Sequence, residues 1–353
     1  MLSAENKALL PTVTVMITAR NRPDELQKTL RLLRKQTYPS VELLVFDDAS
    51  SSPLEALVQQ EWPNAIVVRN ETSYGYIANR SRGFALAGGE FILSLDDDSC
   101  LTGPGDLMTA VEYIQSHPSV GVLAFRVHNG QEFVPPQDSG DVRFLHSFTG
   151  CAHVIRKEAC WMLGGYRDFF EYYAEENEYA LRVMDAGWRI VYMPSICVHH
   201  RVSSIGRNLA RIWAYSLRNN IWTILLNIPA RRLPVELAWK MFVGAVESVR
   251  LLQIGWFFWA IGSALKSAPR ALRLRRPISA ETLRVYDCLR FGLDPKDGKI
   301  SISEVLRWWR QNWLKRRRAN AFWNSGSHGI GGSSTATFSE IEVSSTVGRD
   351  QGR

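Results

Sequence analysis

The chain has 353 residues, of which 46% are hydrophobic and 22% charged, a composition that excludes a chain disordered throughout or a disulfide scaffold. Lys and Arg number 42 against 35 Asp and Glu, and the net charge of +7 makes nucleic-acid binding the first hypothesis to test. The excess is confined to one region, because residues 231–318 alone hold 19 basic and 7 acidic residues. Residues 1–230 have a net charge of −4, and residues 319–353 one of −1.

The cysteines and the N-terminus both bear on where the protein works. The five cysteines are odd in number and form no Cys-x-x-Cys pair, which favours reduced thiols in a cytosolic protein. The first ten residues contain no basic stretch followed by a long apolar run, so no signal peptide is predicted. We therefore expect a cytoplasmic protein.

Short apolar, β-branched runs alternate with helically spaced leucines over the first hundred residues. Strands are predicted at residues 13–17, 41–46, 65–69 and 91–95, with helices over 26–33, from about 53 and over 77–86 between them. This alternation is typical of a Rossmann-like α/β fold with a parallel sheet. Polar residues follow three of the strands, at 18–21, 47–50 and 96–98, and open α/β sheets bind ligands at the carboxyl ends of their strands.

Three consecutive carboxylates, Asp96, Asp97 and Asp98, are the strongest chemical signal in this part of the chain. Neighbouring carboxylates repel one another, and a bound divalent cation relieves that repulsion. The earlier pair Asp47-Asp48 is less specific, because Asp also favours turns and helix N-caps. The triplet therefore predicts a cation site at the edge of the sheet.

A second block of elements follows between residues 148 and 204. It contains a predicted helix from 156, a turn at Gly164-Gly165, a helix that opens with Glu175, Glu176 and Glu178 and ends at Gly187, and strands over 188–193 and 196–200. The three glutamates have two interpretations at this point. They are either catalytic carboxylates or acids that the helix dipole favours in a first turn.

From residue 207 the pattern is helical and rich in Trp and Arg. Residues 251–265 carry no charge, but these 15 residues fall short of the roughly 20 that span a bilayer, so an interfacial or buried helix is expected. Residues 207–220 are expected to pack beside the active site. The region 231–318 has two interpretations: a surface that lies on an anionic membrane, or a helical cap whose basic side chains are simply solvated. From about residue 324 the chain is predicted to be disordered.

The order of these motifs, over residues 12–204, resembles that of the family 2 glycosyltransferases, which have the GT-A fold. The matching segments are residues 15–22, 45–50, 78–83, 91–98 and the stretch from Gly164 to Gly187. No single motif is specific, but five in the same order are. The resemblance implies an α/β, nucleotide-sugar-binding mixed sheet over residues 1–205, a basic, Trp-rich helical region over 206–322 and a disordered tail over 323–353.

The resemblance also implies a divalent cation, Mn²⁺ or Mg²⁺, that binds the diphosphate of the donor. Asp98 and His200 are the implied ligands, and oxygen and imidazole groups suit these metals. His199 is expected on the opposite face, because side chains alternate along a strand. Asp97 or Asp96 is expected to hold the donor ribose or a metal-bound water, and we assign this role to Asp97.

Four further positions match the family's substrate-handling residues. Glu176 corresponds to the catalytic base, where many relatives have Asp. Thr18, Arg20 and Asp48 correspond to contacts with the nucleotide base and ribose, and a carboxylate can accept the imide N–H of uracil or thymine. Arg80 either contacts the base or diphosphate of the donor or is only a structural part of its helix.

These residues predict an inverting, metal-dependent glycosyltransferase that uses a UDP-, dTDP- or GDP-linked sugar. The expected acceptor is a glycan or a lipid-linked molecule, in cell-surface polysaccharide or glycolipid synthesis at the inner face of the cell membrane. One alternative is a sugar nucleotidyltransferase, but residues 18–22 lack the glycines of its phosphate loop. Another is a non-catalytic binding relative, which Asp98, Glu176 and His200 argue against. Nucleic acid is not expected, because no binding motif accompanies the basic charge.

Overall fold

The computed structural model describes residues 10–133, 135, 140–202 and 208–293. The predicted disordered tail over 323–353 lies outside the described residues, as does the part of the basic region from residue 294 onward.

The first half of the described chain forms the parallel part of a mixed nine-stranded sheet. Its parallel strands are β1 (Val13–Ala19), β2 (Val41–Asp47), β3 (Ile66–Arg69) and β4 (Phe91–Asp96), and α2 (Pro23–Leu33), α3 (Glu55–Glu61) and α4 (Tyr76–Leu86) connect them. The strand order β3-β2-β1-β4 has β1 at its centre, and the predicted α/β fold is confirmed. All four strands point their carboxyl ends to the same edge.

The second half of the sheet adds mainly antiparallel pairs. Its elements are β5 (Ser99–Leu101), α5 (Asp106–Ser116), β6 (Val120–Asn129), β7 (Arg143–Phe144), β8 (His153–Arg156), α6 (Lys157–Leu163), a 3₁₀ turn η1 (Asp168–Phe170), α7 (Glu175–Asp185) and β9 (Arg189–His200). The two strands predicted over 188–193 and 196–200 are one strand, β9. The register against β6 shifts between Met193 and Cys197, where Pro194 offers no N–H to a ladder, so the sequence suggested a break where the strand only bulges.

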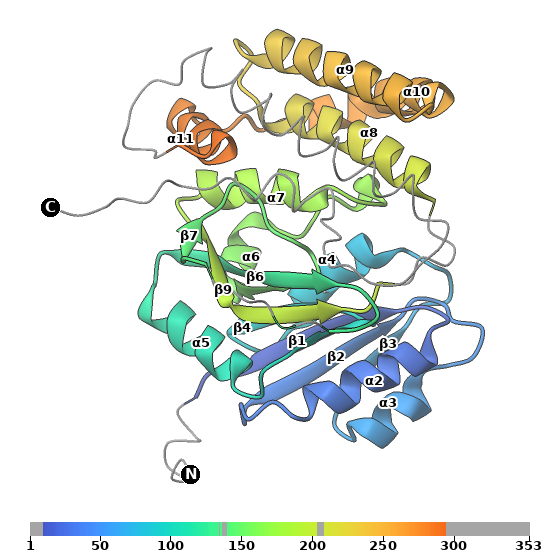
Figure 1. The fold of residues 1–353 in the computed structure, drawn as a ribbon, viewed down its shortest axis with the longest axis vertical. Helices are drawn as coiled ribbons and strands as arrows, with labels where there is room; N and C mark the ends of the chain where they lie inside the picture. The colour runs from blue at the N-terminus through green and yellow to red at the C-terminus, as the bar shows by residue number, and fades with distance from the viewer. Residues whose placement is uncertain (1–9, 134, 136–139, 203–207, 294–353) are drawn as a thin grey trace, which may run out of the picture.

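Alternate side chains of the central strand enter two separate apolar cores. Val15 and Ile17 of β1 pack with α2, α3 and α5, whereas Met16 packs on the other face with α4, α6 and α7. Both sets are buried. The sheet is therefore the middle layer between two layers of helices (Figure 1).

Four helices complete the described chain: α8 (Leu209–Asn227), α9 (Leu233–Arg250), α10 (Ile254–Arg273) and α11 (Ala280–Phe291). Figure 1 shows α8, α9 and α10 stacked beyond α7, on the side away from α2 and α3. The Trp222 ring of α8 is buried in the same core as Tyr179 of α7, and its Nε1 donates to the carbonyl of Ala264 in α10. The division proposed at residue 205 therefore runs through a shared core. Within the described residues, none of the helices combines the length and the apolar character that crossing a bilayer requires.

The turn between α4 and β4 depends on a glycine. A Cβ on Gly89 would lie 2.5 Å from the Thr12 carbonyl oxygen and 2.7 Å from the Thr14 amide nitrogen, both backbone atoms that cannot move away. We expect Gly89→Ala to lower the free energy of unfolding by about 1–3 kcal/mol, measured by urea denaturation. Gly105→Ala is the control, because a Cβ there meets nothing within 4 Å, and an equal loss in both variants would contradict the explanation.

Candidate active site

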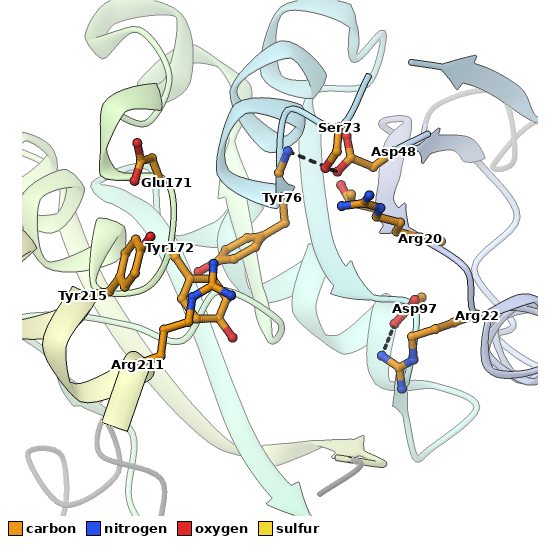
Figure 2. A pocket seen from close by; sticks show the side chains of 13 residues that line it. Arg20, Arg22, Asp48, Ser73, Tyr76, Asp97, Glu171, Tyr172, Arg211 and Tyr215 are labelled. Carbon is orange, nitrogen blue, oxygen red and sulfur yellow. Dashed lines mark hydrogen bonds and ion pairs between the residues drawn. The ribbon is translucent and has the colours of Figure 1, made fainter. Parts of the chain in front are cut away.

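A cavity of about 550 Å³ opens where β1 and β2 end at the sheet edge (Figure 2). Its walls come from both halves of the chain: Thr18, Ala19, Arg20, Arg22, Asp48, Ser73, Gly75, Tyr76, Asp97, Glu171, Tyr172, Arg211 and Tyr215. Four of the five residues predicted to bind the donor, all except Arg80, line it. The strand-end pattern therefore predicted one wall of a real cavity.

Thr18 and Arg20 both have groups left for a ligand. The Thr18 hydroxyl is buried and has no hydrogen-bond partner among the described residues. A buried hydroxyl without a partner is costly, and a bound molecule in the cavity can supply one. Arg20 is exposed at the cavity rim and adds positive charge there.

Asp48 is placed at the cavity but is already fully engaged by the chain. One carboxylate oxygen accepts from the Asn70 side chain at 2.8 Å and the Tyr74 amide at 2.9 Å. The other accepts from Ser73 Oγ at 2.6 Å and the Gly75 amide at 3.1 Å. A carboxylate has about four acceptor sites, so these four donors use its capacity. Asp48 thus fixes the 70–75 turn, and contact with a base requires one of these bonds to open.

The acidic triplet meets His200 because β5 pairs with the end of β9. In that ladder Ser99 is opposite His200, which brings the imidazole to the turn after β4. His200 Nε2 lies 3.1 Å from Asp98 Oδ1 and 3.7 Å from Asp96 Oδ2. His199 points away and bonds the Gly130 carbonyl at 2.8 Å. The structure therefore brings together both predicted metal ligands and adds Asp96.

These groups fit a divalent cation. Two carboxylates and one imidazole converge. Oxygen ligands suit both Mn²⁺ and Mg²⁺, and Mn²⁺ accepts an imidazole ligand more readily than Mg²⁺ does. His200 Nδ1 lies 3.0 Å from the side-chain oxygen of Asn129, a contact that orients the ring and leaves Nε2 toward the carboxylates. Asp96, Cys151 and His200 also have their ligand atoms within 4.8 Å of one another.

The close approach of several carboxylates shifts the pKa values of this cluster. Burial alone would lower the pKa of His200, but Cys151 and the carboxylates of Asp98 and Asp96 raise it to about 11. Burial would raise the pKa of Asp98, yet His200 and Arg22 hold it well below its usual range. Burial raises the pKa of Asp97 to about 8, because repulsion from Asp98 and Asp96 offsets the attraction of Arg22. Another cation at this place would relieve that repulsion.

Arg22 lines the cavity, and no role was predicted for it. Its guanidinium donates to Asp97 Oδ1 and to Asp98 Oδ2, both at 2.7 Å. Asp97, which we expected to contact ribose or a metal-bound water, therefore faces Arg22, while Asp96 is the more exposed member of the triplet. Three consecutive aspartates in a sequence do not show in which direction each carboxylate points.

Glu176, the predicted base, stands at the first turn of α7 beside Glu175. Glu175 is fully buried and lies 3.4 Å from Arg80 Nη1 and 3.3 Å from the Tyr76 hydroxyl. Burial and the charge of Glu176 raise the pKa of Glu175 well above its ordinary value, and burial also raises the pKa of Glu176. The protonated form is therefore favoured at Glu175, the more buried of the two carboxyls. Gly150 makes room for them, because a Cβ there would lie 2.3 Å from Glu176 Oε1.

Arg80 links the two acidic groups instead of lining the cavity. It is buried on α4 and donates to Asp96 through Nη2 and to Glu175 through Nη1. Its guanidinium also lies over the Tyr76 ring, 4.8 Å from the centroid. This geometry does not support a direct contact with the donor, because both ends of the guanidinium are occupied by carboxylates. It favours the interpretation of Arg80 as a structural residue, here one that positions two functional groups.

Helix α8 builds the wall opposite β1, as expected for residues 207–220. Arg211 and Tyr215 enter the cavity directly. Arg218 donates to the Phe170 carbonyl at 2.6 Å and to Glu171 at 3.0 Å. The Asn219 side chain donates to the carbonyls of Phe170, Tyr172 and Tyr173. These bonds fix the segment that carries Glu171 and Tyr172 into the cavity. No single residue of this wall was predicted, because each is an ordinary helix or loop residue in the sequence.

Comparison with known proteins agrees with this architecture. A family model described as Glycosyl transferase family 2 matches residues 14–164. The match assigns residues 14–164 of the chain to this family. Among similar proteins, the amylovoran biosynthesis glycosyltransferase AmsE from Erwinia amylovora is 26% identical to this chain over 219 residues. The match covers 58% of this chain and 80% of AmsE.

Two solved structures share the fold of this chain. S. aureus TarS 1-349 has a TM-score of 0.55 at 18% identity, with 79% of this chain and 87% of that one covered. The mannosyltransferase PcManGT from Pyrobaculum calidifontis, solved with GDP-Man and Mn²⁺, has a TM-score of 0.50 at 17% identity and covers 76% of this chain and 88% of its own. The mixed sheet with C-terminal helices is therefore a GT-A fold.

The wall built by α8 depends on Asn219, which is buried and serves three carbonyls. We expect Asn219→Leu to lower the free energy of unfolding by at least about 2 kcal/mol, because the carbonyls lose their donor in a buried place. Nucleotide affinity should fall as well, since Tyr172 is no longer fixed. Both are measured by thermal unfolding with and without nucleotide.

Asn220→Leu is the matched control for this change. The Asn220 amide donates to Ser216 within its own helix and receives only a long bond, 3.3 Å, from Asn177. A loss of stability in Asn220→Leu as large as in Asn219→Leu would contradict the role of the three carbonyl bonds.

Proposed function

We propose that this glycosyltransferase catalyses inverting, metal-dependent transfer of a sugar from a nucleoside-diphosphate donor. The observation that carries the proposal is the convergence of Asp96, Asp98 and His200 beside a cavity walled by Thr18 and Arg20. A divalent cation, which prefers oxygen and imidazole ligands, and the donor nucleotide would then bind side by side.

The donor nucleotide is assigned to the cavity. Its base and ribose would reach Thr18, whose buried hydroxyl has no partner among the residues described, and Arg20 at the rim. The ring of Tyr76 offers a flat apolar wall for the base or sugar. Asp48 holds the turn that presents Ser73 and Gly75, so it acts on the donor through this turn or, after one bond opens, directly.

We assign the cation site to Asp98 and His200, with Asp96 beside them. Asp97 is the ion-pair partner of Arg22. A bound Mn²⁺ or Mg²⁺ supplies charge that stabilises the leaving diphosphate. His200 must be neutral at Nε2 to act as a ligand, and the contact of Nδ1 with Asn129 favours that tautomer. Arg22 lies within reach of the same carboxylates and keeps them ordered.

Glu176 is assigned as the general base. Its carboxylate accepts the proton of the acceptor hydroxyl while the acceptor oxygen bonds the anomeric carbon, and the bond from that carbon to the diphosphate breaks with inversion. Glu175 lies beside Glu176 at the start of α7, and Arg80 donates to both Glu175 and Asp96, so it holds these two acids at a fixed spacing. An intact set of these groups favours an enzyme over a non-catalytic sugar-binding relative.

The acceptor is assigned to a glycan or a lipid-linked molecule in polysaccharide or glycolipid synthesis. AmsE, by its name, works in the biosynthesis of the polysaccharide amylovoran, which supports a polysaccharide product. We assign the transfer reaction to the cytoplasmic face of the membrane, where nucleotide sugars and lipid-linked acceptors are both present. A sugar nucleotidyltransferase is less well supported, since the loop after β1 contains no glycine to cradle a triphosphate.

Removal of Asp98 tests the cation site. We expect Asp98→Asn to abolish Mn²⁺ binding, followed by electron paramagnetic resonance, and to lower sugar transfer at least a hundredfold, because one of two carboxylate ligands is neutralised. Asp24→Asn is the control, since Asp24 is an exposed carboxylate two residues beyond Arg22. Full transfer by Asp98→Asn with the metal chelated would remove the metal from the mechanism.

Removal of the base tests the chemistry. We expect Glu176→Gln to keep nucleotide-sugar affinity and to lower kcat by about 10²–10⁴, the usual contribution of a general base. Because the pKa of Glu176 is raised, the acid limb of the wild-type kcat–pH profile should lie above the ordinary glutamate range, and transfer should rise with pH through it.

Glu158→Gln controls for the loss of a glutamate near a helix start, because Glu158 is exposed in the first turn of α6. Unchanged kcat in Glu176→Gln, or an equal loss in Glu158→Gln, would assign the base to another residue.

A further inference from the structure

An apolar stripe runs along the outer side of each of the two helices α9 and α10. On α9 the exposed members follow helical spacing: Val235, Phe242, Val246 and Val249. On α10 they do the same: Ile254, Phe258, Leu265 and Leu272. Residues spaced by three, four or seven share one face of a helix, so each set is a continuous stripe. Such contiguous exposed apolar surface marks an interaction site.

The two stripes meet at the turn between the helices, at Leu252. Its side chain is 85% exposed, the highest value among the large apolar residues, and its backbone has the left-handed φ of 55°. A leucine side chain this exposed buries little apolar surface within the fold, and the left-handed backbone is unfavourable for it. Its position at the tip of the helical hairpin suits insertion into an apolar environment outside the protein.

The charge around the stripes is mainly positive. From residue 231 to 280 the exposed charged residues are Arg231, Arg232, Lys266, Arg270, Arg273 and Arg276. The two acids of the segment turn inward: Glu236 pairs with Arg232 and Arg290, and Glu247 accepts from the Trp213 indole. Arg270 pairs with the exposed Asp168 of the neighbouring 3₁₀ turn, and the other exposed charges of the segment remain cations. An apolar face bordered mainly by exposed cations complements an anionic lipid surface.

We propose that the α9–α10 face, defined by these two stripes and Leu252, docks the enzyme on an anionic lipid bilayer. A second copy of the chain is a poorer occupant, because a symmetric contact would bring together two faces whose exposed charges are mainly cations. Trp239, Trp256 and Trp259 lie on the same two helices; the first two are part-buried and Trp259 is exposed, as suits side chains at the level of lipid headgroups.

The face also borders the cavity. Tyr215, a cavity residue, has its ring 4.9 Å from that of Trp259, the neighbour of Phe258 on α10, and Tyr172 contacts Tyr215 from the other side at 5.6 Å. Docking through Phe258 would thus bring the cavity rim close to the bilayer. This step rests on the proposed function, because it makes a lipid-linked acceptor the one within reach.

The test is co-sedimentation of the full chain with vesicles of phosphatidylcholine, with and without phosphatidylglycerol, at low salt. We expect binding to the anionic vesicles, and Leu252→Asn with Phe258→Gln to weaken it at least about tenfold through loss of buried apolar surface. Asn tolerates the left-handed backbone of residue 252, so the fold is kept. Lys266→Gln with Arg273→Gln should weaken binding to the anionic vesicles by roughly thirtyfold, at about 1 kcal/mol for each charge.

Trp161→Gln with Met162→Gln is the matched control, because these exposed apolar residues lie on α6, away from the face. Failure of the wild-type chain to bind anionic vesicles would overturn the proposal, as would equal binding by the Leu252→Asn, Phe258→Gln variant. A wild-type dimer that this variant converts to monomers, seen by light scattering, would overturn it in favour of a second copy.

Nucleotide-sugar binding is measured separately, as the rise in melting temperature that the donor causes without vesicles. The docking variants should keep this rise, because none of them changes a cavity residue. Absence of the rise in the wild-type chain would reject the proposed function and leave the vesicle result to stand by itself.

Discussion

The arrangement of this site follows from the need to hold many carboxylates close together in a partly buried place. Asp96, Asp97, Asp98, Glu175 and Glu176 gather near the sheet edge, and like charges at this spacing destabilise the fold unless they are compensated. The chain compensates them with three cations, each shared between two acids. Arg22 joins Asp97 to Asp98, Arg80 joins Asp96 to Glu175, and His200 joins Asp96 to Asp98.

This sharing connects the two halves of the chemistry. Arg80 is the only one of the three cations that reaches both the triplet after β4 and the start of α7, so it sets the spacing between the cation site and the base. It is also the residue for which the sequence left two interpretations open. Its helix position gave no hint of partners 16 and 95 residues away, and only the folded chain shows them.

What the sequence predicted well is what neighbouring residues encode. The alternation of strands and helices, the polar residues after β1, β2 and β4, and the acidic start of α7 are local patterns, and the structure has them all. Which member of the triplet faces which partner is not local, because it depends on the path of the turn between β4 and β5. The α8 wall is less local still, since Arg211 meets a cavity built by residues nearly two hundred positions earlier.

The uneven charge of the chain takes on a physical meaning once α8 is seen as part of the enzyme. A basic, Trp-rich appendage that only anchored the protein could be placed anywhere, yet α8 packs one side on α7 and its other side on α10. The same helix therefore forms the cavity wall through Tyr215 and supports the helices whose outer face carries the exposed cations. Because Tyr215 also touches Trp259, a movement of α10 on contact with a charged surface would be felt at the cavity wall. The helices that carry the exposed cations and the wall of the cavity thus share one aromatic contact, that of Trp259 with Tyr215.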